Sequence, residues 1–390
     1  RMQLREGYAT GPVAGIALGA PARCLIGRGA RAALPEAVAQ IGRSVLMLRS
    51  ASVPWADRLE ADLRARGLEV TGITARGEPG VDQLRAGLAQ ARAAGADCVL
   101  AIGGGAVIDL GKAIAGLFHS DGDVLDYLGL GPAAASGGAR PALADPLPCV
   151  AVPTTAGTGA EATSNAVIGV PGRGLKISLR DPRMVPDLAV VDPALCDGLP
   201  RALTLATGLD ALTQLIESYL SCRATPLTDA LCRGMIGPAA AALRALMRAE
   251  DPAARDTLSK ASYLSGLALA NSGLGVVHGL AAVIGSRGGA HGAICGRLLP
   301  AALQVNREVL TRNGAQTARF DEVEGWLAAG LGGGLRGFID ANGLADLDAL
   351  HCPPALWDVT ARAALTASST QANPVQLSVP EIRRILSLSA

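Results

Sequence analysis

Short apolar runs alternate with amphipathic stretches along the first half of the chain. The run SVLMLRS (44–50) has the continuous apolar character of a buried strand, and WADRLEADLRARG (55–67) has the apolar spacing of a helix. The same alternation predicts further strands at 68–74, 97–105, 148–155 and 187–193, and further helices at 80–95 and from about 106. Strands separated by helices indicate a parallel sheet that is covered by helices.

The pattern changes near CDGLPRALTLATG (196–208). From there to the C-terminus, helical segments rich in Ala and Leu follow one another, with Gly and Pro at the breaks. We therefore predict an α/β domain over residues 1–198 and an all-α domain over residues 199–390.

Composition and charge narrow the classes of function. Of the 390 residues, 49% are hydrophobic and 3% aromatic, and the formal net charge is +1. A balanced charge without basic runs argues against nucleic acid or a membrane surface as a partner. No apolar stretch reaches the roughly 18 residues that a membrane span needs. No apolar region follows the charges of RMQLREGYATG (1–11) as it would in a signal peptide.

The eight cysteines are scattered and form no C-x-x-C pair. In a chain of this length, that pattern predicts reduced, mostly buried thiols in a cytoplasmic protein. A zinc–thiolate site is not expected, because the ligand spacings that such sites use are missing.

Two polar turns follow predicted strands in the first half. In VLAIGGGAVIDLGKAIA (99–115), a strand runs into Gly103, Gly104 and Gly105 and then into a helix, whose N-terminus suits a pyrophosphate. The same glycines also fit a tight turn that needs them only for packing, since the G-x-G-x-x-G fingerprint is absent. The second turn is PTTAGTGAEATSNAVI (153–168), and its hydroxyls come from Thr154, Thr155 and Thr158. Two such turns in one α/β domain favour a crevice for a dinucleotide.

Candidate metal ligands lie in the second half. Asp210 and Gln214 are four residues apart in the helical pattern TGLDALTQLIESY (207–219), so they share a helix face. Of the four histidines, His278 and His291 fall in one segment, 273–300. A carboxylate and imidazoles can bind zinc or ferrous iron, but a histidine in an apolar helix can equally be a core residue. His119 and His351 lie outside this pattern and are interpreted as surface or core residues.

Taken together, these motifs resemble the iron-containing (group III) alcohol dehydrogenases, which include lactaldehyde reductases and butanol dehydrogenases. More distant relatives are the glycerol dehydrogenases, maleylacetate reductases and dehydroquinate synthases. The matching segments run in family order over nearly the whole chain: GRGA (27–30), AIGGGAVIDLGKAIA, VPTTAGTGAEATSNAVI, LKISL (175–179), VVDPALCDGLPRALTLATGLDALTQLIESY, GLGVVHGLAA, AHGAICGRLLP and ANP (372–374). The resemblance implies a dehydroquinate synthase-like fold, with a Rossmann-like nucleotide domain followed by a helical metal domain.

By this resemblance the metal ligands are Asp210, the residue at 214, His278 and His291. The family usually has histidine at 214, whereas this chain has Gln214, a neutral and weak oxygen donor. The implied metal is Fe(II), with Zn(II) as the alternative. Ala282 stands where many members have a further histidine, and Ala106 stands where serine usually follows the glycine turn.

The resemblance also bears on cofactor and substrate. Family members that prefer NAD(H) often have aspartate at the end of the strand 44–50, where this chain has Arg49 and Ser50, so NADP(H) is expected over NAD(H). Asp109 is expected to help fix the cofactor, and Lys176 is a candidate contact of cofactor or substrate. Arg287 lies between the two histidines and would favour an anionic aldehyde, with a carboxylate or phosphonate, if it faces the substrate; a solvated loop arginine is the alternative.

The implied activity is reversible, metal-assisted hydride transfer between a small aldehyde and its primary alcohol. One alternative is a maleylacetate-reductase-like activity on an oxoacid. Another is a metal-free nucleotide-binding scaffold that lacks catalysis. The family default is a homodimer or a larger homo-oligomer, with no nucleic-acid or membrane partner.

Overall fold

The computed structural model describes residues 17–135 and 137–390. Two compact units are present: the first extends to Thr154 and continues over Ala160–Leu195, and the second comprises Thr155–Gly159 and Cys196–Ala390. The N-terminal stretch that lacks the features of a signal peptide lies outside the described residues.

The first unit is built on a six-stranded parallel sheet with the order β1-β8-β5-β4-β2-β3. Its strands are β1 (Arg23–Ile26), β2 (Ser44–Ser50), β3 (Glu69–Ala75), β4 (Cys98–Gly103), β5 (Cys149–Pro153) and β8 (Leu188–Val191). The α/β fold class predicted from the apolar runs is therefore confirmed, and β2 has the bounds of the predicted strand.

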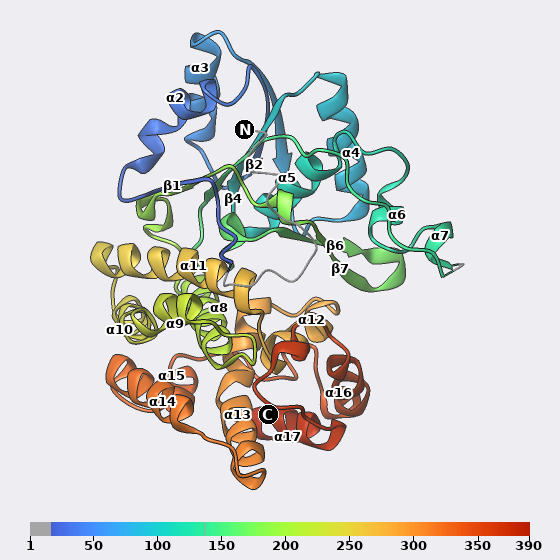
Figure 1. Ribbon diagram of the computed structural model, residues 1–390. Helices are drawn as coiled ribbons and strands as arrows, with labels where there is room; N and C mark the ends of the chain where they lie inside the picture. The colour runs from blue at the N-terminus through green and yellow to red at the C-terminus, as the bar shows by residue number, and fades with distance from the viewer. Residues whose placement is uncertain (1–16, 136) are drawn as a thin grey trace. The chain divides into compact units, whose positions relative to one another are not determined.

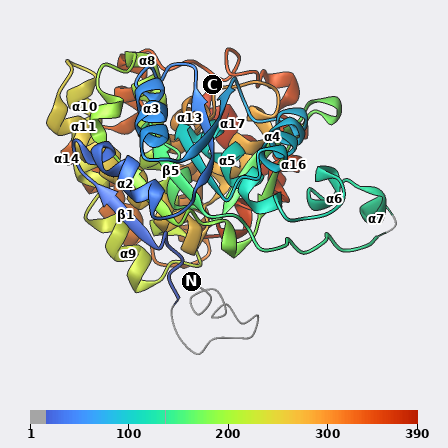
Figure 2. The ribbon, with the colours of Figure 1, turned by 90° about the horizontal axis from the view of Figure 1, so that it is seen from above.

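Helices cover both faces of this sheet. The longer ones are α2 (Leu34–Ala39), α3 (Ala56–Ala65), α4 (Val81–Ala93) and α5 (Gly105–Leu117), and two short ones are α6 (Val124–Tyr127) and α7 (Pro132–Ala135). Alternate residues of β2 enter two separate cores: Val45 and Met47 pack with α2 and α3, whereas Leu46 and Leu48 pack with α4 and α5. Figures 1 and 2 show these two helix pairs on opposite sides of the strands. Because both faces are buried, β2 is apolar without alternation.

Two features of this unit were not predicted from the sequence. The edge strand β1 is only four residues long. In addition, β6 (Asn165–Val170) and β7 (Leu175–Arg180) form a separate antiparallel hairpin, whose apolar residues Ala166, Ile168 and Leu179 pack into the same core as α5. The start of β6 lies inside the segment that was interpreted only as a polar turn.

The second unit is helical, as predicted. Its helices are α8 (Arg201–Leu220), α9 (Pro226–Arg233), α10 (Ile236–Leu246), α11 (Pro252–Ser272), α12 (Val276–Gly285), α13 (His291–Arg312), α14 (Ala318–Leu331), α15 (Leu335–Ala341), α16 (Trp357–Leu365) and α17 (Val379–Ser389). Helix α8 is buried along all of its last 13 residues, from Gly208 to Leu220, so the polar side chains of this stretch are held inside the unit. Among the described residues, no single helix is long and apolar enough to cross a membrane, although α11 and α12, which meet at a bend of 103°, pass that test together by length and composition.

Candidate metal centre

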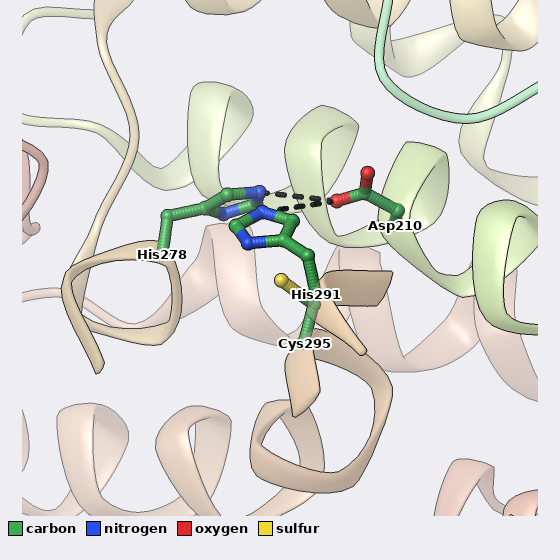
Figure 3. Close-up of side chains that lie close together, drawn as sticks. All are labelled: Asp210, His278, His291 and Cys295. Carbon is green, nitrogen blue, oxygen red and sulfur yellow. Dashed lines mark hydrogen bonds and ion pairs between the residues drawn. The ribbon is translucent and has the colours of Figure 1, made fainter. Parts of the chain in front are cut away.

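Three helices bring four potential metal ligands together in the helical unit. Asp210 comes from the middle of α8, His278 from the first turn of α12, and His291 and Cys295 from the first two turns of α13. One ligand atom of each residue lies within 4.8 Å of those of the other three. Figure 3 shows the carboxylate, the two imidazole rings and the sulfur converging on one point.

His278 is oriented by Glu217, which lies two turns after Asp210 on α8. The Glu217 carboxylate accepts the backbone N–H of Val277 at 2.7 Å and that of His278 at 3.3 Å, so it caps the start of α12. Its Oε2 also lies 2.7 Å from Nδ1 of His278. A proton on Nδ1 satisfies this bond and leaves the Nε2 lone pair free for a metal, which is the usual support for a histidine ligand.

The distances around Asp210 suit a divalent metal. Its Oδ1 lies 3.3 Å from Nε2 of His278 and 3.8 Å from Nε2 of His291. Ligands of a tetrahedral zinc, about 2.0–2.3 Å from the ion, are about 3.3–3.6 Å from one another. Asp210 and His278 already have this spacing, and the distance between Asp210 and His291 is slightly longer. The donor set therefore fits a metal.

Electrostatics link the sulfur to the two imidazoles. Burial by itself would raise the pKa of Cys295, but His278 and His291 lower that pKa below the ordinary thiol value. Burial lowers the pKa of both imidazoles, yet the combined attraction of Cys295 and Asp210 raises the pKa of His278 well above its usual value and that of His291 to about 9. Without a metal, the cluster thus holds protons that a cation would displace.

Gln214 lies one turn after Asp210 and is buried, and both ends of its amide are bonded to protein groups. Its Oε1 accepts the hydroxyl of Ser265 at 2.6 Å, and its Nε2 donates to the carbonyl of Thr158 at 3.3 Å. That Gln214 is a metal ligand therefore stays a prediction. His119 and His351 take no part in the cluster: His119 bonds the carbonyl of Asp145, and His351 occupies a left-handed turn.

Sequence reasoning missed two residues of this centre. Cys295 belongs to no C-x-x-C pair, although it follows His291 by one helical turn, which puts both on one face. Glu217 was passed over within an apolar helix, although it follows Asp210 by two turns and so shares its face. In both cases, the sequence signal is the helical spacing from a predicted metal ligand, His291 or Asp210.

Some of the predicted nucleotide residues, namely Arg49, Gly103 and Thr154, lie at the carboxyl edge of the sheet in the first unit. β2 and β4 are neighbours in the sheet. The connection from β2 leads outward to β3, and the connection from β4 leads in the opposite direction to β5. The carboxyl ends of β2 and β4 therefore form a topological switch point. Arg49 is in register with Ile102, directly before the Gly103–Gly105 turn, and the backbone N–H of Thr154 donates to the carbonyl of Gly103 at 3.0 Å.

The glycine turn serves packing and also leaves a helix N-terminus open. A Cβ on Gly103 would lie 2.7 Å from the side chain of Val107, so packing alone requires glycine there. Gly104 is the N-cap of α5 and has no side chain to satisfy the first N–H groups of that helix. Those groups and the helix dipole suit an anionic pyrophosphate. The two interpretations of this turn are therefore compatible.

The other predicted residues have protein partners. Arg49 forms an ion pair with Asp57 at 2.7 Å, and Ser50 bonds Ser52. Asp109 accepts the backbone N–H of Val167 at 2.9 Å and pairs with the buried Lys112 at 3.0 Å, which fastens α5 to β6. Lys176 pairs with Glu78 at 3.0 Å, and Arg287 donates to the hydroxyl of Thr360 at 2.8 Å. Thr155 and Thr158 belong to the helical unit.

Comparison with known proteins gives consistent matches over both units. The model for "Iron-containing alcohol dehydrogenase" matches residues 21–193, and that for "Fe-containing alcohol dehydrogenase family, C-terminal" matches residues 204–390. The probable alcohol dehydrogenase EutG of Escherichia coli K12 is 36% identical over 262 residues, which cover 65% of this chain and 64% of that protein. The NAD-dependent methanol dehydrogenase of Bacillus methanolicus is 34% identical over 271 residues, which cover 68% of this chain and 69% of that protein.

The fold agrees with these sequence matches. The crystal structure of a 1,3-propanediol oxidoreductase superposes with a TM-score of 0.84 at 28% identity, and the match covers 96% of this chain and all of that one. By sequence, however, the matched region spans less than two thirds of the length of EutG.

Proposed function

The chain belongs to the iron-containing alcohol dehydrogenase family, and we propose that it transfers hydride reversibly between a nicotinamide cofactor and a small aldehyde or its primary alcohol. The observation that carries the proposal is the convergence of Asp210, His278 and His291 in the unit that matches the family's C-terminal model. The name of one relative, the lactaldehyde reductase of Escherichia coli K12, which is 37% identical over 231 residues, points to the same chemistry in that protein.

A divalent metal held by these donors, Fe(II) or Zn(II), would polarise a carbonyl as a Lewis acid, and the nicotinamide would supply or accept the hydride. The protein's own contribution is to position these groups. Asp210 provides a negative oxygen donor, His278 and His291 provide neutral nitrogen donors, and Glu217 fixes the ring of His278. His291 is 42% exposed, which leaves one side of the cluster accessible.

For the cofactor, we propose that its pyrophosphate lies at the N-terminus of α5 and its adenosine near the ends of β2 and β4. The switch point between these strands is where dinucleotides bind in open parallel sheets. Arg49 and Ser50 end β2 and would face the ribose, and Arg49 favours the 2′-phosphate of NADP(H). Asp57 already neutralises Arg49 in part, so NAD(H) is the competing cofactor.

For the substrate, Arg287 supports an anionic aldehyde. One arm of its guanidinium bonds Thr360, and a guanidinium has five N–H donors, so others remain for a carboxylate or phosphonate. The direct comparison is turnover of a carboxylate-bearing aldehyde and of an uncharged aldehyde of the same length, in the wild type and in Arg287→Gln. An unchanged ratio of kcat/KM between the two substrates in the variant would overturn the role of Arg287.

The main test is oxidation of NADPH and NADH by anaerobically purified protein on a panel of small aldehydes and one unsaturated oxoacid. The panel is repeated after chelation and after return of Fe(II) or Zn(II), with His278→Ala as the inactive control. We expect aldehyde turnover that is lost on chelation and restored by metal. Preferred turnover of the oxoacid would support the maleylacetate-reductase alternative. Stoichiometric metal without turnover of any substrate would overturn the proposed activity.

A further inference from the structure

We propose that the fourth protein ligand of the metal centre is the sulfur of Cys295 and that the amide of Gln214 remains in its protein hydrogen bonds. The centre is then an Asp/His/His/Cys set that prefers zinc to ferrous iron. This inference rests on the metal centre of the proposed function and adds the identity of one ligand and of the preferred metal.

Geometry favours the sulfur. His291 and Cys295 lie one turn apart on α13, so the same helix face presents an imidazole and a thiol to the cluster. The Cys295 sulfur lies within 4.8 Å of the ligand atoms of Asp210, His278 and His291, and the residue is completely buried (Figure 3). Because α8, α12 and α13 are packed helices, these positions are set by the core and not by a mobile loop.

The surroundings of Gln214 oppose its use as a ligand. Its carbonyl oxygen accepts a short hydrogen bond from Ser265 on α11, and its nitrogen donates to the backbone of residue 158. With Gln214 only 4% exposed, a rotation toward the metal would break both bonds in a place that is largely shielded from water. The sulfur of Cys295 already faces the cluster, so its ligation needs no such rotation.

The metal preference follows from ligand chemistry. Thiolate is a soft donor that selects zinc, and zinc also stands above ferrous iron in the affinity order for mixed nitrogen, oxygen and sulfur sites. A zinc site with one sulfur, two nitrogens and one carboxylate oxygen uses only donors that zinc commonly takes.

The test is cobalt(II) substitution followed by absorption spectroscopy, with zinc affinity measured by chelator competition. A thiolate bound to cobalt(II) gives a charge-transfer band in the near ultraviolet, whereas amide, imidazole and carboxylate ligands do not. Wild-type protein is compared with Cys295→Ser, Gln214→Ala and a matched control, Cys232→Ser, which changes another fully buried cysteine of the same unit. Melting temperatures of all four proteins separate a structural role of Cys295 from ligation.

We expect the band in the wild type, in Gln214→Ala and in Cys232→Ser, and its loss in Cys295→Ser. Zinc affinity should fall in Cys295→Ser by more than the roughly 10–100-fold that loss of an outer partner of a metal ligand costs. Stoichiometric cobalt without the band, a band that persists in Cys295→Ser, or no bound metal in the wild type would overturn the inference. A band without aldehyde turnover would support this inference and overturn the proposed activity.

Discussion

Nδ1 of His278 lies 2.7 Å from Oε2 of Glu217, and the same carboxylate caps the first turn of the helix that carries the histidine. One buried side chain on α8 therefore fixes the start of α12, the orientation of the ring and the position of its proton. Asp210, on the same face of α8, then meets the opposite ring nitrogen at 3.3 Å. The candidate ligand Asp210 and the supporting residue Glu217 thus lie two turns apart on α8.

We predict that Glu217→Gln weakens metal binding without removing any ligand. The amide cannot accept all three N–H bonds with a full negative charge, so the His278 ring is held less firmly. Loss of the hydrogen-bond partner of a metal ligand costs roughly 10–100-fold in metal affinity. Chelator competition measures the effect, with Glu322→Gln as the control, since Glu322 bonds Tyr219 elsewhere in the helical unit. Equal affinities of the two variants would contradict the role of Glu217.

Release of Arg49 from its ion pair should shift cofactor preference. Asp57→Asn leaves the guanidinium unpaired, so the ratio of kcat/KM for NADPH over NADH is expected to rise. The increase should be at most about fivefold, because a pair with an exposed partner is worth about 1 kcal/mol or less. Asp62→Asn on the same helix changes the net charge equally but leaves the pair intact. A ratio that moves equally in both variants would assign the effect to net charge.

Glu161 should make stability depend on pH. Burial raises its pKa from 4.5 to about 7, and its carboxylate is buried near Lys112. Below pH 4.5 it is protonated in both folded and unfolded chains. As the pH rises toward 7, the unfolded chain ionises first, so folding loses up to about 3 kcal/mol that stays lost above pH 7. Urea unfolding of Glu161→Gln should lack this loss, and parallel pH profiles of variant and wild type would contradict the assignment.

The contact between Gly159 and Gly266 should tolerate no side chain. A Cβ on Gly266 would lie 2.3 Å from the carbonyl oxygen of Gly159, which itself has φ of +60°. Gly266→Ala is therefore expected to destabilise the protein by about 1–3 kcal/mol through overpacking. Gly325→Ala is the matched control in α14, where a Cβ meets nothing within 4 Å, and it should be neutral or stabilising. Thermal unfolding compares the two variants, and equal melting temperatures would contradict the close approach.

Most of the strands that the sequence revealed are buried on both faces, and the exception is the edge strand β3, which is half-exposed. β2 and β4 carry unbroken apolar runs, which identify them without any partner. β6 was missed because only one of its faces is buried and its first residues, beginning at Asn165, continue a polar turn. β1 was missed because four residues on the sheet edge give too short a pattern. Apolar runs and alternation both report burial, so a strand that is very short or that continues a polar turn escapes detection.

The candidate centre was foreseeable in part. The spacing of Asp210 and the family motifs around His278 and His291 selected three of the four clustered residues. That these three meet depends on how α8, α12 and α13 pack, which no local pattern reports. Cys295 has no such motif, and only the packed helices show that it faces the same point. The bonds of Gln214 to Ser265 and Thr158 join residues far apart in the chain, so they too were invisible in the sequence.

The segment 155–159 gives the chain an interlaced path. The chain passes from the α/β unit to the helical unit after Thr154 and contributes five residues there. It returns to the α/β unit at Ala160 and enters the helical unit again after Leu195. A single proteolytic nick between Leu195 and Cys196 would therefore leave the N-terminal fragment still holding a piece of the helical unit. A recombinant fragment starting at Cys196 would lack the partner of Gln214 and the glycine that packs against Gly266. We therefore expect neither unit to fold completely when it is expressed without the other.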